Sequence, residues 1–252
     1  MQNRQFHIIA HRGASYQAPE NTLAAVNLAW QQNADAVEID VQLSGDGILV
    51  AIHDLDTDRT AGVKKRVNNL MLAELQMLDV GSWKGNIWKN QSIPTLAQIL
   101  STVPAGKRVY IEMKGGKELL PVLKEELENS RLEPAQIILI DFDLDNLIRA
   151  KKVFPELTFL WNYEYASPLN HDIFETLFPQ IIKQAAKSGM DGVNWEKCDF
   201  FTRKFIQKAL NVGLVTSVWS VNDPGQAQFL KDIGIVGLTT DRPGWIREQL
   251  SL

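Results

Sequence analysis

The chain has 252 residues, of which 45% are hydrophobic and 22% are charged, a balance that is typical of a globular protein with a sizeable core and excludes a disordered chain. Its formal net charge is −4, and no run of Lys and Arg is longer than the three residues 64–66, so binding to a nucleic acid has no electrostatic support. The single cysteine, Cys198, excludes an internal disulfide and a cysteine-rich zinc site.

The apolar stretch near the N-terminus is short. His7 and His11 interrupt it, so it resembles neither a signal peptide nor a membrane span. No later segment approaches the roughly 18 uninterrupted apolar residues of a candidate transmembrane helix. We therefore expect a cytoplasmic protein without stable membrane association, and the sequence does not indicate its oligomeric state.

Short β-rich runs alternate along the chain with segments of helical periodicity. The candidate strands are His7–Ala10, Ala36–Gln42, Val109–Lys114, Gln136–Asp141, Leu157–Trp161, Gly192–Trp195, Val215–Trp219 and Val236–Thr239. The candidate helices are Leu23–Gln32, Leu119–Asn129, Leu144–Lys152, Phe178–Ser188, Arg203–Asn211 and Pro224–Asp232. This alternation indicates right-handed βαβ units and a parallel sheet. Because eight strands in a chain of this length favour closure over an open doubly wound sheet, we predict an α/β fold, a single (β/α)8 TIM barrel.

One β-rich run, Ile48–Ile52, lies outside this alternation. It follows the second strand after the short turn 44–47, Ser-Gly-Asp-Gly, which permits a hairpin but no parallel crossover. We expect the hairpin to carry His53 back over the barrel mouth. The long stretch 55–94 contains the helical segment Leu70–Leu78 and predicts a small insertion that covers part of the cleft. The chain, 1–252, would then be one domain.

Acidic side chains share one face on two candidate strands. Glu38 and Asp40 are two residues apart, so both point to the same side while their apolar neighbours point to the other. Glu112 follows the same alternation in the third strand. In a parallel barrel the apolar face meets the helices, so these acids should face the interior. Three carboxylates this close need a counter-charge, and oxygen ligands suit Mg²⁺ or Ca²⁺, with Mn²⁺ as a further choice.

Two basic residues accompany these acids. Arg12 follows the first strand, and Lys114 shares a face with Glu112. One interpretation is a structural salt-bridge cluster without a metal. The other is a phosphodiester site: three carboxylates and two basic groups leave a charge of −1, which a bound divalent ion changes to +1. Arg12 would then bind two phosphate oxygens, and Lys114 would stabilise charge in the transition state.

Two of the four histidines stand where strands run out into loops. His11 ends the first strand and His53 ends the predicted hairpin. Each alone is more often structural, but a pair beside an acidic cluster suits acid–base catalysis at the attacking and leaving oxygens of a phosphodiester. Trp219 ends the seventh strand and is either a core residue or an apolar wall of the site. Asn222 and Asp241 also lie at the predicted rim, where their roles could be purely structural.

These residues belong to an ordered set of motifs that spans nearly the whole chain. The motifs are HRG at 11–13, PENTLAA at 19–25, VEIDVQLSGDGILVAIHD at 37–54, IPTL at 93–96, IEMK at 111–114, VWSVN at 218–222 and TTDRP at 239–243. In content and order the set resembles the glycerophosphodiester phosphodiesterase family, in its bacterial cytoplasmic form. HRG alone would be a weak signal, but the ordered set is highly specific. Residues 55–61 depart from the family's pattern, which we expect to affect substrate shape more than chemistry.

The resemblance implies a phosphoric diester hydrolase that converts small-molecule glycerophosphodiesters to glycerol 3-phosphate and an alcohol. It implies one divalent metal ion bound by Glu38, Asp40 and Glu112. It further implies His11 and His53 as the acid–base pair.

Within the same resemblance, Arg12 and Lys114 correspond to phosphate contacts. If Trp219 is an apolar wall of the site and not a core residue, it would lie against the glycerol backbone of the substrate. Glu20 and Asn21 match the PEN motif. We interpret them first as N-terminal residues of a helix, with Asn21 near the cap, and only second as supports of the site.

The predicted reaction begins with attack of the glycerol 2-hydroxyl on phosphorus, which gives a cyclic phosphate that water then opens. We favour His11 as the base and His53 as the acid, and direct attack by water stays open as an alternative. A second alternative is a lysophospholipase D-like or other phospholipid phosphodiesterase, for which the stretch Trp83–Trp88 is the candidate apolar rim. A catalytically idle binding module is disfavoured because no acid or histidine is missing.

Overall fold

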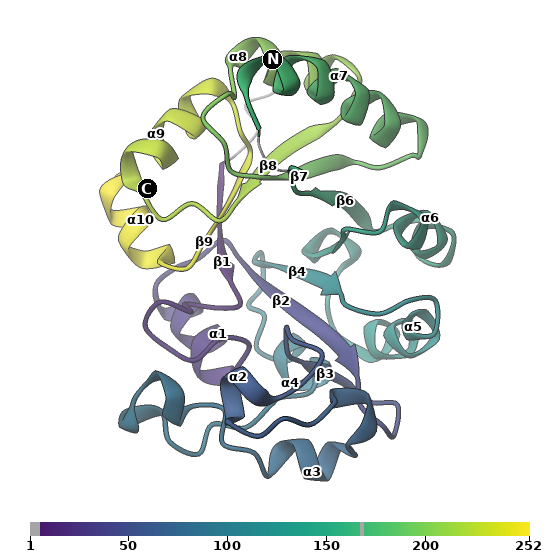
Figure 1. Ribbon diagram of the computed structural model, residues 1–252, viewed down its shortest axis with the longest axis vertical. Coiled ribbons are helices and arrows are strands. Elements are labelled where there is room, and N and C mark those ends of the chain that lie inside the picture. Colours follow the sequence, from purple (N-terminus) through teal and green to yellow (C-terminus); the bar gives the residue numbers. More distant parts are fainter. Residues whose placement is uncertain (1–5, 167–168) are drawn as a thin grey trace.

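The protein is described by a computed structural model over residues 6–166 and 169–252. Eight parallel strands form a ring, and helices surround it (Figure 1). The parallel strands in the described ranges are β1 (His7–His11), β2 (Ala36–Leu43), β4 (Arg108–Met113), β5 (Ile137–Asp141), β6 (Thr158–Tyr163), β7 (Gly192–Glu196), β8 (Val215–Trp219) and β9 (Gly237–Thr240). Because β1 pairs with both β9 and β2, the sheet is closed. The predicted TIM barrel is confirmed.

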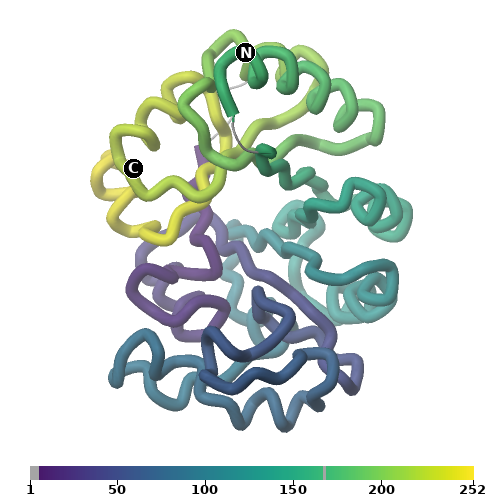
Figure 2. Tube along the Cα trace, in the orientation of Figure 1, coloured from purple at the N-terminus to yellow at the C-terminus, as the bar shows by residue number. Residues whose placement is uncertain are grey.

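The chain passes round the barrel once. Its C-terminal part, in yellow, therefore lies beside the N-terminal strand β1, in purple (Figure 2). The predicted strands agree with the observed ones to within two residues at each end, because parallel strands covered on both faces are read from continuous β-rich runs.

Helices follow the strands along the chain and cover the outside of the barrel. They are α1 (Leu23–Gln31), α4 (Leu96–Leu100), α5 (Leu119–Asn129), α6 (Leu144–Val153), α7 (His171–Lys187), α8 (Arg203–Asn211), α9 (Pro224–Ile233) and α10 (Pro243–Gln249). The predicted start of α7 at Phe178 is wrong. Asn170 caps this helix by accepting a hydrogen bond from the Ile173 N–H, at 2.9 Å, and Pro179 lies inside it. Among the described residues, no helix is long and apolar enough to cross a membrane.

Alternate residues of each strand enter two different clusters. Val37, Ile39 and Val41 of β2 pack in the large core between the strands and the helices. Inside the barrel, a smaller cluster that includes Ile9 and Tyr110 fills the space. The two-residue period of a strand therefore directs the acids of β2 into the interior, as the alternation predicts.

The predicted hairpin is also present. Strand β3 (Leu49–Ala51) pairs antiparallel with β2, with Val41 opposite Ala51. The stretch 55–94 that follows contains the short helices α2 (Asp58–Ala61) and α3 (Leu72–Gln76) and lies on one side of the barrel, beyond β3 (Figure 1). Its apolar residues form one cluster with two residues of the hairpin segment, Val50 and Ile52. This shared cluster supports the interpretation of 55–94 as an insertion in a single domain, which stays a prediction.

Gly13 allows the loop after β1 to lie directly against α1. Its φ is +86°, and a Cβ at this position would lie 2.5 Å from the carbonyl carbon of Ala25. Because the same loop carries Arg12, the close approach of the two backbones determines where that side chain enters the barrel mouth.

We expect Gly13→Ala to lower the free energy of unfolding by about 3 kcal/mol or more, since the methyl group meets backbone atoms that cannot move independently. Gly47→Ala is the matched control. Its φ is +79°, but no atom lies within 4 Å of the added Cβ, so it should cost only about 1 kcal/mol, the penalty for the left-handed conformation. Denaturant unfolding measures both. Equal losses would show that the contact with α1 is unimportant.

Candidate active site

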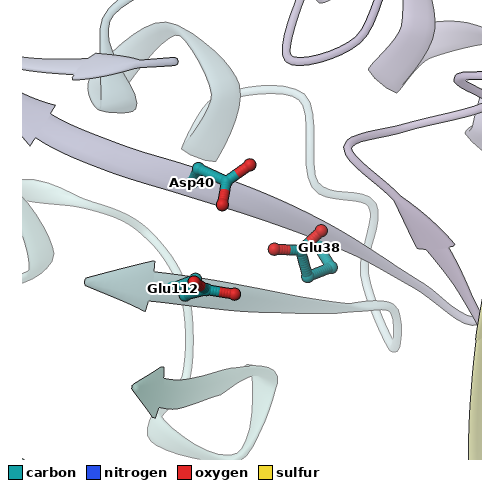
Figure 3. Close-up of side chains that lie close together, drawn as sticks. All are labelled: Glu38, Asp40 and Glu112. Atoms are coloured by element: carbon teal, nitrogen blue, oxygen red, sulfur yellow. The ribbon is translucent and has the colours of Figure 1, made fainter. Parts of the chain in front are cut away.

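Three buried carboxyl groups meet at the mouth of the barrel. The side chains of Glu38 and Asp40 on β2 and of Glu112 on β4 lie on neighbouring strands and close together (Figure 3). Each offers an oxygen within 4.8 Å of the others, and none of the three residues is more than 8% exposed. The strand register brings them together, because Asp40 is paired with Glu112.

The protonation of these groups reflects burial and mutual repulsion. Burial, and next the charge of Asp40, raise the pKa of Glu38 and of Glu112. Burial also acts to raise the pKa of Asp40, but the charges of Arg12 and Lys114 outweigh it and lower that pKa. Glu38 and Glu112 therefore resist ionisation unless further positive charge is present. A buried set of oxygen donors that lacks positive charge fits a divalent cation.

Arg12 contacts two carboxyl groups of this cluster, those of Glu38 and Asp40. Its φ of +53° turns the backbone N–H toward Glu38 Oε2, to which it donates at 3.0 Å. The guanidinium Nε lies 3.1 Å from Asp40 Oδ2, and one terminal nitrogen donates to Glu20 Oε1 at 2.8 Å. A non-glycine residue in the left-handed region is uncommon and is tolerated where surrounding contacts hold it. These contacts fix the direction of the guanidinium.

Lys114 approaches the same cluster from β4's end. Its Nζ forms an ion pair with Glu112 and lies 3.3 Å from Asp40 Oδ1. The ammonium also lies 5.7 Å from the centre of the Phe142 ring. Lys114 and Arg12 thus provide the two positive charges that the sequence pattern indicates, on either side of Asp40.

His11 is held by a carboxylate. Its Nδ1 lies 2.7 Å from Asp241 Oδ1, and because a carboxylate only accepts hydrogen bonds, Nδ1 carries the proton and Nε2 is left free. Asp241 in turn accepts from Ser15 Oγ at 3.1 Å and from Asn222 Nδ2 at 2.6 Å. Burial acts to lower the pKa of His11, but the hydrogen bond with Asp241 and the charge of Glu38 outweigh it and raise that pKa.

His53 is held in the same way. Its Nδ1 lies 2.7 Å from Asp54 Oδ1, which again leaves Nε2 free. The Gln42 side-chain amide lies 2.7 to 3.0 Å from the carbonyl oxygens of residues 52–54 and fixes this segment to β2. The pKa of His53 is lowered, chiefly by burial, although the charge of Asp40 opposes the shift. The hairpin thus delivers His53 to the mouth, as expected.

The N-cap of α1 is Thr22, and Asn21 directly precedes it, near the cap as expected. The Thr22 hydroxyl accepts from the Ala25 N–H at 3.2 Å, whereas Asn21 has a φ of +54° and not the extended conformation of a capping residue. Its side chain instead donates to Asp40 Oδ2 at 2.8 Å and accepts from the Asp40 N–H at 3.2 Å. The second interpretation of the PEN motif, as a support of the site, therefore describes these contacts better.

A chain of polar side chains that the sequence analysis missed crosses the barrel interior. Ser217 Oγ donates to Asn194 Oδ1 at 2.8 Å, Asn194 Nδ2 donates to Asn162 Oδ1 at 2.9 Å, and Asn162 Nδ2 donates to Glu112 Oε2 at 3.1 Å. Each bond fixes the orientation of the next amide, so Glu112 is held from the far side of the barrel. The available signal was the same one that identified Glu112: a polar residue at an inward position near the end of a strand.

A cavity of about 340 Å³ joins these groups. All of the predicted site residues except the more deeply buried Asp40 line it, together with Ile140, Phe142, Asn162, Glu164, Asn194 and Thr239. Trp219 is half-buried, donates from Nε1 to the Asn194 carbonyl at 3.1 Å and meets the Phe142 ring edge-on at 5.6 Å. Of the two interpretations of Trp219, a wall of the site thus fits better than a core residue.

Proteins of similar sequence and structures of similar fold are known. A family model described as the glycerophosphoryl diester phosphodiesterase family matches residues 11–245. YhdW of Bacillus subtilis is 34% identical over 242 residues, which cover 95% of this chain and 96% of that protein. A glycerophosphodiester phosphodiesterase of Caldanaerobacter subterraneus is 32% identical over 206 residues, 75% of this chain and 84% of its own.

Solved structures are similar to this chain over nearly its full length. A phosphodiesterase of Oleispira antarctica, in complex with the product sn-glycerol-3-phosphate, is 29% identical, with a TM-score of 0.85 and coverage of 98% of this chain and 97% of that chain. Family match, sequence identity over most of the chain and shared barrel agree with one another. The chain therefore belongs to the glycerophosphoryl diester phosphodiesterase family and is a phosphoric diester hydrolase.

Proposed function

We propose that this chain hydrolyses small, water-soluble glycerophosphodiesters to glycerol 3-phosphate and an alcohol, with one divalent metal ion and two catalytic histidines. The observation that carries the proposal is the convergence of three buried carboxylates with His11 and His53 around one cavity. The relative from Oleispira antarctica, in complex with the product sn-glycerol-3-phosphate, supports the nature of the product.

Glu38, Asp40 and Glu112 would hold the cation, either Mg²⁺ or Ca²⁺, with Mn²⁺ as a further choice. When bound, such an ion supplies positive charge to the phosphate and lowers the pKa of the glycerol 2-hydroxyl. The protein already orients the ligands: Arg12 N–H binds Glu38, Asn21 binds Asp40 and Asn162 binds Glu112. Such outer contacts keep carboxylates in place for a metal.

Arg12 and Lys114 are the proposed phosphate contacts. Both line the cavity, and each lies beside Asp40, whose charge keeps it protonated. The planar guanidinium suits two phosphate oxygens, while the Lys114 ammonium would stabilise the charge that grows on phosphorus-bound oxygens in the transition state. Trp219 and Phe142 would form the apolar wall against the glycerol carbons.

We assign the role of base to His11 and that of acid to His53. Besides His11, Asp241 accepts hydrogen bonds from Ser15 and Asn222, which are both neutral, so its charge increases the basicity of the His11 imidazole. Asp54 shares its charge with the guanidinium of Arg59, at 2.6 Å, and so stabilises a protonated His53 less. His11 would take the proton of the 2-hydroxyl, and His53 would give a proton to the departing alcohol.

A phospholipid substrate stays an alternative for the same site.

Metal dependence can be tested separately from catalysis with Glu38→Gln. Burial and the charge of Asp40 raise the pKa of Glu38 in the folded protein, so above its unfolded pKa an ionised Glu38 destabilises the metal-free fold. The metal-free variant should therefore melt about 2 °C or more above the metal-free parent at pH 8, yet gain nothing from Mg²⁺ or Ca²⁺ and show no turnover.

Glu128 is an exposed residue of α5, and Glu128→Gln is the matched control for the loss of one negative charge. Its melting temperature and turnover should equal those of the parent. EDTA should abolish turnover of a panel of glycerophosphodiesters, and a divalent ion should restore it. Undiminished activity after metal removal would refute the role of the three carboxylates.

The cyclic route can be tested with a diester in which propane-1,3-diol replaces glycerol. This substrate lacks the 2-hydroxyl, so the attack that closes a five-membered cyclic phosphate is impossible, and turnover should fall by about 100-fold or more. Phosphorus NMR follows the products and should detect a cyclic phosphate from the glycerol diester only. Equal turnover of the two substrates would instead establish direct attack by water.

The histidine roles can be separated with two leaving groups on the same glycerol phosphate. An ethanolamine diester needs protonation of its alcohol, whereas a p-nitrophenyl diester does not. We expect His53→Ala to lose about 100- to 10,000-fold on the first and little on the second, and His11→Ala to lose activity on both. The reverse pattern would exchange the two roles, and near-normal turnover of both diesters by His53→Ala would remove it from the mechanism.

A further inference from the structure

Arg59 connects the insertion to the barrel mouth. It lies on α2, and its side chain is 43% exposed. Its Nε donates to Asp54 Oδ2 at 2.6 Å, and its two terminal nitrogens donate to the two oxygens of Glu20 at 2.7 and 2.8 Å. One side chain from the insertion therefore binds two carboxylates that come from different loops of the barrel.

Each of these two carboxylates also binds a residue of the candidate site. Asp54 binds His53 Nδ1 at 2.7 Å, and Glu20 binds the guanidinium of Arg12 at 2.8 Å. Arg59 is thus one side chain away from both the proposed acid and a proposed phosphate contact. These contacts connect the segment after β3 with the segment between β1 and α1.

We propose that Arg59 is a positioning residue that holds His53 and Arg12 in their working orientations through Asp54 and Glu20. The inference rests on the proposed roles of His53 and Arg12. With this role, part of the insertion would affect the catalytic step as well as which substrates fit the site. Arg59 does not line the cavity and so acts through the two carboxylates.

The shape of the guanidinium explains why this position holds an arginine. Its rigid fork presents nitrogens in two directions, so it can bind Glu20 with both terminal nitrogens and Asp54 with Nε. A lysine ammonium is a single point of charge and cannot reproduce this geometry. Without Arg59, Glu20 would lose the two hydrogen bonds that Arg59 donates to it, and Asp54 would lose the contact that fixes its second oxygen.

The test compares Arg59→Gln and Arg59→Lys with Arg66→Gln. Arg66 is an exposed arginine of the same insertion and serves as the control for lost charge. For Arg59→Gln we expect kcat/KM to fall about 10- to 100-fold. The lost contact with Asp54 should lower kcat through His53, and the lost contact with Glu20 should raise KM through Arg12. Arg59→Lys should recover part of this loss, and Arg66→Gln should match the parent.

The two branches can be separated by changing the carboxylates. Asp54→Asn should lower mainly kcat, because the amide can donate to Nδ1 and favour the wrong tautomer of His53. Glu20→Gln should raise mainly KM. Adding Arg59→Gln to Asp54→Asn should lower kcat by less than it does in the parent, since the contact is already lost. Nitrogen-15 NMR of the His53 ring should show a partial loss of the Nδ1–H form in Arg59→Gln.

A merely structural Arg59 predicts a different outcome. Arg59→Gln would then lower the melting temperature while the folded fraction kept the parent's kcat, KM and His53 spectrum, and this result would overturn the inference. If His53→Ala is inactive but Arg59→Gln equals Arg66→Gln, the inference alone fails. If His53→Ala retains normal turnover, the proposed function of His53 fails whatever Arg59 does.

Discussion

Electrostatic repulsion among three buried carboxylates is the constraint around which the barrel mouth is arranged. Glu38, Asp40 and Glu112 offer oxygens within 4.8 Å of one another in a place with little access to water. A low-dielectric surrounding makes like charges at this distance strongly unfavourable. Arg12 and Lys114 offset part of this repulsion by pairing with Asp40. The cluster still lacks positive charge, which makes it suited to a divalent cation and, with the cation, to a phosphate.

The two halves of the barrel contribute different chemistry. Strands β1, β2 and β4 and the loops after them carry most of the ionisable groups that line the cavity, whereas β5 to β8 and the loops after them supply amides, a hydroxyl, aromatic rings and the carboxyl group of Glu164. The chain from Ser217 through Asn194 and Asn162 to Glu112 joins the halves. A closed parallel barrel permits this because the ends of all its strands surround the same opening.

Carboxylates outside the cluster hold the groups that would move protons. Asp241 binds His11 and Asp54 binds His53, each at 2.7 Å, and in both cases the bond selects which ring nitrogen is free. The neighbours of the two carboxylates differ, since Arg59 shares the charge of Asp54. Two similar pairs thus acquire different proton affinities through their surroundings.

The sequence by itself determined the strands, the barrel and the inward direction of Glu38, Asp40 and Glu112, because a strand's two-residue alternation is a local property and buried parallel strands are continuous β-rich runs. Only the tertiary structure decided how Asn21 and Arg59 reach the site. The left-handed conformation of Asn21 and the fold of the insertion onto the loop before α1 bring together residues far apart in the chain. Contacts of this kind depend on packing between segments, which leaves no periodic pattern in the sequence.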